Sequence, residues 1–163
     1  MSMFEDRHYQ WRETYFVLFD AAQRPKLEAL KKKLAGAGSR FTFSNCVTDK
    51  KGRIESLTIL APDDFAALDI SYLAGDEVRE EAQSLAEELR SGDCSREDRA
   101  KIDRLRNCDG RFDVLHFEKV GDRDEPPEQD DDMFDPSGLL LVLNALAELT
   151  DGIAVDPQSG ALL

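Results

Sequence analysis

The densest group of side chains that could perform chemistry lies between Gly121 and Asp135. This stretch holds eight carboxylates and one arginine, a net charge of −7. Carboxylate oxygens are the ligands that hard cations such as Mg²⁺ prefer. Asp130, Asp132 and Asp135 therefore form one candidate metal site, which would suit a small metal-assisted hydrolase. The EF-hand template for Ca²⁺ fails, because a loop that began at Asp130 would have phenylalanine at its fifth position and leucine at its twelfth.

The same stretch also favours an interpretation without chemistry. Blocks of like charge are usually solvated, flexible segments that attract a partner of opposite charge. We therefore predict an acidic flexible loop over residues 121–135, in which Asp130, Asp131 and Asp132 contact a basic protein. Asp135 has a different role, because an aspartate followed by proline is typical of a helix start.

Aromatic and cationic side chains gather before the first predicted strand, in the sequence RHYQWRE. Tryptophan, tyrosine and arginine are enriched among the residues that dominate binding energy at protein interfaces. Trp11 and Arg12 are therefore candidate partner-binding residues. The alternative, that this segment packs over one end of the core, stays open.

The cysteines and histidines form no known metal motif. Cys46, Cys94 and Cys108 are widely spaced and odd in number, which indicates free thiols in a reducing compartment. Two histidines, His8 and His116, lack the short spacing of a zinc site. Cys46 and His116 both lie on predicted strands and could approach each other as a nucleophile and base, although a free cysteine is commonly a small buried hydrophobe. We assign no catalytic residue and expect no cofactor.

The net charge of the chain indicates which classes of partner it can bind. The chain has 163 residues, which suits one domain over 1–163, and its 21 basic and 34 acidic residues give a net charge of −13. Nucleic acids and anionic membranes are expected to be poor partners, because both require clustered lysine and arginine. A protein partner with a basic surface fits this charge better.

The apolar runs are short. The start of the chain has no apolar signal core, and the longest run, Leu139 to Leu143, is far below the roughly 20 residues that a membrane helix needs. We therefore expect a cytoplasmic protein without a membrane partner.

Hydrophobic periodicity predicts the elements that must position these residues. Strands are expected at Thr14–Asp20, Arg40–Val47, Ile54–Leu60, Leu68–Leu73 and Phe112–Val120, the second and third forming a hairpin. Helices are expected after Pro25, at Asp76–Arg90, from Ser95 towards Cys108, and at Gly138–Thr150. The chain would end in a small hairpin that turns at Asp156–Gly160. This order predicts an α+β fold, a mainly antiparallel sheet with helices packed on one face and a ferredoxin-like core with additions.

The C-terminal sequence LAELTDGIAVDPQSG, Leu146 to Gly160, resembles that of small bacterial α+β proteins of unknown function. Its features are an apolar helix that ends in LT-x-G, then a strand and a D-P-x-S-G turn. The resemblance implies a fold type and carries over no catalytic residue.

Three functional hypotheses follow. The first is a non-catalytic cytosolic interaction or regulatory module, of the immunity or inhibitor kind, that binds a basic protein. The second is the metal-assisted hydrolase that would use the carboxylates between Asp130 and Asp135. The third is a homodimer whose sheet edge or N-terminal aromatics form the interface.

Overall fold

The computed structural model of the protein describes residues 8–37, 40–61, 66–90, 95–119, 137–159 and 161–163. In these ranges the chain forms seven strands, four α-helices and a short 3-10 helix at Ala21–Gln23. The strands are β1 (Tyr9–Phe19), β2 (Thr42–Thr48), β3 (Ile54–Ala61), β4 (Ala66–Ala74), β5 (Gly110–Lys119), β6 (Ile153–Asp156) and β7 (Ala161–Leu162). The helices are α1 (Leu27–Ala35), α2 (Asp76–Arg90), α3 (Arg96–Leu105) and α4 (Ser137–Thr150).

Local signals explain the ends of these elements. α1 buries Leu27, Leu30 and Leu34, the predicted apolar stripe. α3 begins where the Ser95 hydroxyl accepts a hydrogen bond from the backbone N–H of Asp98, at 3.1 Å. These observations confirm the sequence interpretation of both helices.

The strands form a single sheet in the order β2-β3-β4-β5-β1-β6-β7, and every neighbouring pair is antiparallel. The α+β class and the antiparallel sheet are thus confirmed. The ferredoxin-like core is not confirmed, since the chain builds one long antiparallel series in which β1 lies between β5 and β6.

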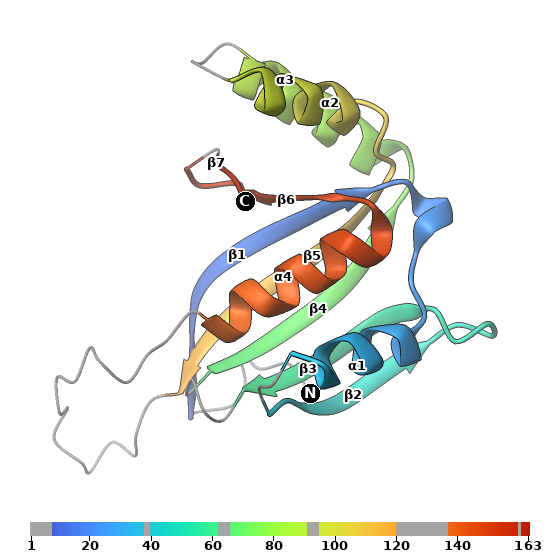
Figure 1. Ribbon diagram of the computed structural model, residues 1–163, viewed down its shortest axis with the longest axis vertical. Coiled ribbons are helices and arrows are strands. Elements are labelled where there is room, and N and C mark those ends of the chain that lie inside the picture. The colour runs from blue at the N-terminus through green and yellow to red at the C-terminus, as the bar shows by residue number, and fades with distance from the viewer. Residues whose placement is uncertain (1–7, 38–39, 62–65, 91–94, 120–136, 160) are drawn as a thin grey trace, which may run out of the picture.

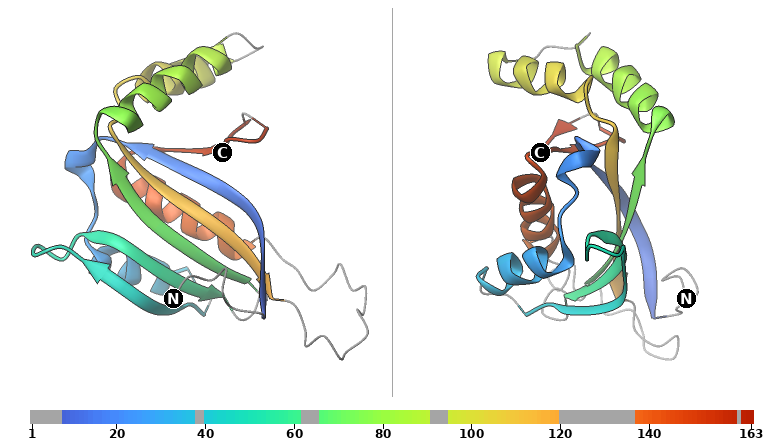
Figure 2. Two further views of the ribbon diagram at one scale, coloured as in Figure 1. Left: turned by 180° about the vertical axis from the view of Figure 1, so that it is seen from behind. Right: turned by 90° about the vertical axis from the view of Figure 1, so that its right-hand side faces the viewer.

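The prediction that the helices cover one face of the sheet is correct only for α1 and α4. These two helices pack on the larger core cluster, which includes Val17, Ile59 and Val114 from the sheet (Figure 1). α2 and α3 pack on a second cluster with Leu18, Ile153 and Val155 at one end of the other face (Figure 2). β1 permits this arrangement because Val17 and Leu18, on opposite sides of the strand, are both buried.

Among the described residues, none of the helices combines the length and the apolar character that a membrane crossing requires. The predicted strand at Leu68–Leu73 and the C-terminal hairpin are both confirmed, as β4 and as β6 with β7. The predicted loop at 121–135 lies outside the described residues.

Candidate functional site

The face of the sheet opposite α1 and α4, here called the open face, carries the best candidate surface. Antiparallel pairing places directly opposed residues on the same face. Leu73 pairs with Arg111, and Arg111 pairs with Leu18, whose side chain contacts the α2–α3 cluster. Beyond these two helices, no described helix covers the rest of this face (Figure 2).

Exposed apolar side chains lie on the open face. Trp11 pairs with Phe117 on this face and is 39% exposed, and Leu73 is 41% exposed. The indole N–H of Trp11 donates to the Thr14 hydroxyl at 3.2 Å, so its polar edge is satisfied within the strand. Phe16, on the same side of β1, is half-buried beneath the guanidinium of Arg111, whose Cζ atom is 4.4 Å from the ring centroid. Phe117 beside Trp11 is fully buried, so the exposed contacts of the open face are separate: Trp11 lies towards one end of β5 and Leu73, opposite Arg111, towards the other.

Two carboxylates flank Arg111 on the open face. Arg111 donates from Nε to Asp113 at 2.7 Å and from NH1 to Glu81 of α2. Burial raises the pKa of Asp113, and the charge of Arg111 opposes that rise. One guanidinium faces two carboxylates, so the formal charge of the cluster is −1.

α2 adds further negative charge at this end of the open face. The helix has six acidic residues against two arginines. Glu77 lies one turn before Glu81, so it projects on the same side of the helix. The open face thus combines apolar area with an acidic border, which suits a partner that is both apolar and basic.

Arg12, the second predicted partner-binding residue, lies at an irregularity in the pairing of β1 with β5. Its guanidinium donates to Glu118 at 3.1 Å, and both side chains are partly exposed. The structure therefore brings Trp11 close to the open face, while Arg12 is engaged in an ion pair with the neighbouring strand.

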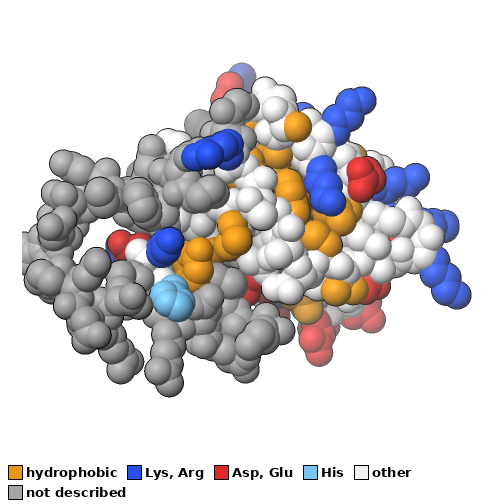
Figure 3. Space-filling model, turned by 90° about the horizontal axis from the view of Figure 1, so that it is seen from below, with side chains coloured by type: hydrophobic (Ala, Val, Ile, Leu, Met, Phe, Trp, Pro, Cys, Tyr) orange, Lys and Arg blue, Asp and Glu red, His pale blue; other side chains and the backbone are white. Residues whose placement is uncertain are grey.

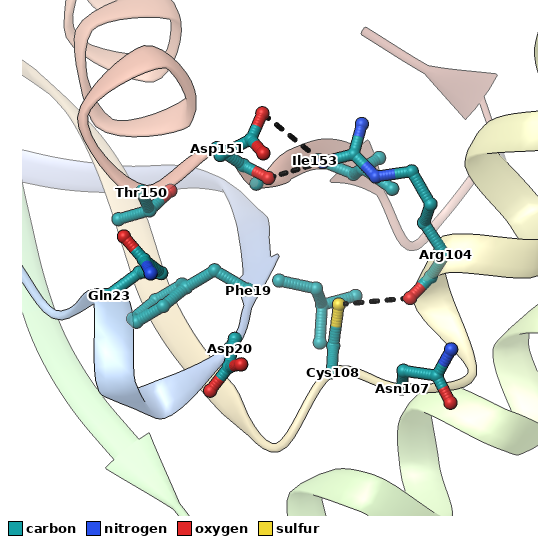
Figure 4. Close-up of a pocket in the computed structure, with 11 residues that line it drawn as sticks. Phe19, Asp20, Gln23, Arg104, Asn107, Cys108, Thr150, Asp151 and Ile153 are labelled. Atoms are coloured by element: carbon teal, nitrogen blue, oxygen red, sulfur yellow. Dashed lines mark hydrogen bonds and ion pairs between the residues drawn. The ribbon is translucent and has the colours of Figure 1, made fainter.

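A hollow of about 330 Å³ lies where the C-terminal ends of α3 and α4 meet the end of β1 (Figure 4). Several of its polar groups have structural partners. The Asp20 carboxylate accepts from the N–H of Ala22, Thr150 donates to the carbonyl of Leu146, and Arg104 pairs with Asp151. These three contacts satisfy groups at the ends of helices, so they do not by themselves indicate a ligand site.

Cys108 also lines this hollow, but its thiol is poorly suited to nucleophilic chemistry. It donates to the carbonyl of Arg104, and burial raises the pKa of Cys108 to about 11. The thiolate is the reactive form of cysteine, so a raised pKa suppresses reactivity at neutral pH. Cys108 behaves as the small buried hydrophobe that the sequence suggested.

The proposed approach of Cys46 to His116 is wrong. Cys46 lies exposed on β2, at one edge of the sheet, whereas His116 is buried on β5. Two strands separate β2 from β5, which corresponds to a spacing of about 14 Å. The side chains therefore cannot share a proton.

The predicted metal ligands Asp130, Asp132 and Asp135 lie outside the described residues, as do the predicted partner-binding Asp131 and the thiol of Cys94. Within the described ranges, the side chains that could bind a metal do not gather into groups of three or more. The metal interpretation of the acidic stretch therefore stays a prediction.

Comparisons with protein-family models, with curated proteins and with solved structures gave no match. The resemblance of the C-terminal sequence to small bacterial proteins likewise stays a prediction.

Sequence reasoning missed Leu73, Arg111, Asp113 and Glu81. In the sequence, Leu73 is an ordinary apolar residue of a predicted strand, and Glu81 is one of several acidic residues of a predicted exposed helix. Nothing in either pattern indicates a binding residue. Only the register of β4 against β5, and the position of α2 over the end of the sheet, bring them together. A usable signal was the alternation in β5, where Arg111 and Asp113 occupy the side opposite Phe112 and Val114.

Proposed function

We propose that the protein is a non-catalytic interaction module that binds a basic partner on the open face of its sheet. The observation that carries the proposal is the combination, on one face, of exposed Trp11 and Leu73 with the carboxylates of Glu81 and Asp113. Aromatic anchors often dominate the binding energy of an interface, and aliphatic side chains contribute buried apolar area. Charges at its border speed association and select partners by sign.

The net charge of −13 supports the same class of partner, because it repels polyanions and attracts basic proteins. A regulator of a basic enzyme, such as an immunity protein or an inhibitor, is one form that this function would take. We also propose that the protein functions in the cytoplasm.

The test uses Trp11, the only tryptophan of the chain, as a built-in reporter. The probe is a synthetic peptide of alternating lysine and leucine, with a glutamate–leucine peptide of the same length as the charge control. We expect the basic peptide to shift the Trp11 emission to shorter wavelength, because docking removes the indole from water. High salt should weaken the effect.

Leu73→Ala and Leu140→Ala form a matched pair of variants. Both leucines are similarly exposed, at 41% and 48%, but Leu140 lies on α4, which packs on the other face. Leu73→Ala should weaken peptide binding by about fivefold to thirtyfold, the range for truncation of an interface anchor. Leu140→Ala should leave it unchanged. Equal binding of the two peptides, or equal losses in the two variants, would overturn the proposal.

A further inference from the structure

The hollow between β1, α3 and α4 has a second set of polar groups, which the fold does not use. Gln23 and Asn107 line it with carboxamides that make no hydrogen bond to the residues that the structure describes. The Asp20 carboxylate accepts one backbone hydrogen bond, and none of the described cations pairs with it. Asp20 and Gln23 lie on one side of the hollow and Asn107 on the other, beyond Cys108 (Figure 4). We call these three exposed residues, Asp20, Gln23 and Asn107, the rim of the hollow.

The floor of the hollow is apolar. Leu18, Phe19 and Ile153 line it, and at most 4% of each residue is exposed. Buried Thr150 and Cys108 complete the floor, and each already donates its side-chain hydrogen to a helix carbonyl. The volume of about 330 Å³ is at the lower end of the roughly 300–1,000 Å³ of ligand pockets. The hollow therefore fits a small molecule whose apolar part covers the floor and whose polar end meets the rim.

Two helix ends make the hollow electrostatically negative. The C-terminal ends of α3 and α4 both border it, and the C-terminal end of a helix has a partial charge of about −0.5. α4 has no basic residue in its last turn to balance this charge, whereas α1, α2 and α3 each have at least one. Arg104 is the single cation among the lining residues, and its guanidinium is already bound to the carbonyl and the carboxylate of Asp151. A further cation at the rim is therefore favoured.

Many cations of the chain are concentrated elsewhere. Residues 24–53 hold nine of the 21 basic residues and only two acids. They include α1, β2 and the turn after β2, and the surface seen from below, where α1 and β2 lie in Figure 1, shows Lys and Arg side chains (Figure 3). Every residue that lines the hollow lies outside this range, in the part of the chain with 12 basic and 32 acidic residues. The lysine-rich part of the chain therefore lines surfaces other than the hollow.

We infer that the hollow binds a small organic cation, a primary ammonium on a short aliphatic stem. The stem lies on the apolar floor, and the ammonium donates to the Asp20 carboxylate and to the carboxamide oxygen of Gln23 on the same side. An ammonium has three donors and no acceptor, which matches a rim made of one carboxylate and two carboxamides. An anion fits less well, because it would face two helix C-terminal ends, and the guanidinium of Arg104 is already engaged.

Nuclear magnetic resonance with three ligands of the same stem tests the inference. Butylamine, butanol and pentanoate share a butyl group, and at neutral pH their polar ends are positive, neutral and negative. Backbone amide shifts report where each ligand binds. We expect butylamine to shift the amides of residues 20–23, 104–108 and 150–153, with a Kd of about 1 mM or weaker because the ligand has few atoms. Butanol should bind more weakly, and pentanoate should leave these amides unshifted.

Asp20→Asn and Asp156→Asn form a matched pair of variants. At each position the carboxylate accepts a hydrogen bond at 3.0 Å from the backbone N–H two residues later, and an asparagine can keep that bond. Asp156 ends β6 and does not line the hollow. Asp20→Asn should weaken butylamine binding by about threefold to tenfold, because it removes the charge that faces the ammonium. Asp156→Asn should leave butylamine binding unchanged.

Gln23→Lys adds a competing ammonium at an exposed position of the rim, so it should also weaken butylamine binding. Larger shifts with pentanoate than with butylamine would assign the hollow to anions through Arg104 and overturn the inference. Equal shifts with all three ligands, no shift of these amides with butylamine, or equal losses in Asp20→Asn and Asp156→Asn would overturn it as well. Leu73→Ala should leave butylamine binding unchanged, so this inference and the proposed peptide binding can fail separately.

Discussion

At the scale of single residues, His116 is a titratable group that the fold keeps uncharged. The side chain is buried on β5, and burial, aided by the charge of Arg12, lowers the pKa of His116 to about 4. The pKa of histidine in an unfolded chain is about 6.5. As the pH falls below about 6.5, the His116 imidazole binds a proton in the unfolded chain but not in the folded protein.

This difference predicts a loss of stability with acid. The contribution of His116 is fully present above about pH 6.5, falls between pH 6.5 and 4, and levels off below pH 4 at a loss of up to about 3 kcal/mol. Urea unfolding at several pH values should therefore show a shallower decline for His116→Gln than for the wild type. His8→Gln, at an exposed position, should keep the wild-type decline. Identical slopes in all three proteins would contradict the assignment.

At the scale of elements, the end of α4 shows why a glycine is needed at position 152. Asp151, with a φ of 50°, adopts the left-handed conformation, whereas Gly152 does not. The backbone conformation at position 152 therefore does not require glycine. A Cβ atom at Gly152 would lie 2.6 Å from the carbonyl oxygen of Leu18 and 2.6 Å from the Thr150 hydroxyl. The glycine instead permits α4 to pass directly over β1.

Gly152→Ala should therefore destabilise the protein by about 1–3 kcal/mol, the typical cost of overpacking. The matched control is Gly36→Ala at the end of α1, where an added Cβ atom meets only the carbonyl oxygen of Lys33, at 3.6 Å. Thermal unfolding of both variants measures the difference. A Gly152→Ala protein as stable as Gly36→Ala would show that β1 and α4 can shift apart at little cost.

The elements themselves were largely predictable, and their arrangement was not. α2 has the bounds that its apolar stripe predicts, and the turn of the β2–β3 hairpin falls at the predicted DKKG sequence. The apolar stripe of α2 does not show which face of the sheet the helix covers. Leu18 lies in an apolar strand sequence that would be the same if another helix covered it. Trp11 was predicted as a binding residue from its type alone, but Leu73 and Glu81 depend on strand register and helix placement.

At the scale of the whole molecule, the two core clusters differ in size. Among the described residues, the cluster under α1 and α4 has eighteen buried hydrophobic residues, and the one under α2 and α3 has nine, three of them alanine or cysteine. α3 itself buries only Ile102 and Leu105. Since buried apolar area supplies most of the stability of a segment, α2 and α3 should open in a separate, lower-energy step.

Hydrogen exchange measured by mass spectrometry tests this division. We expect the amides of α2 and α3 to exchange faster than those of β5, which is hydrogen-bonded on both sides by β1 and β4. Leu105→Ala removes a core side chain of the smaller cluster and should cost about 2–5 kcal/mol. Its effect should fall mainly on α2 and α3, whereas Leu146→Ala in the larger cluster should raise exchange across the whole sheet. Equal protection of α3 and β5, or a uniform response to Leu105→Ala, would mean that the two clusters unfold as one cooperative unit.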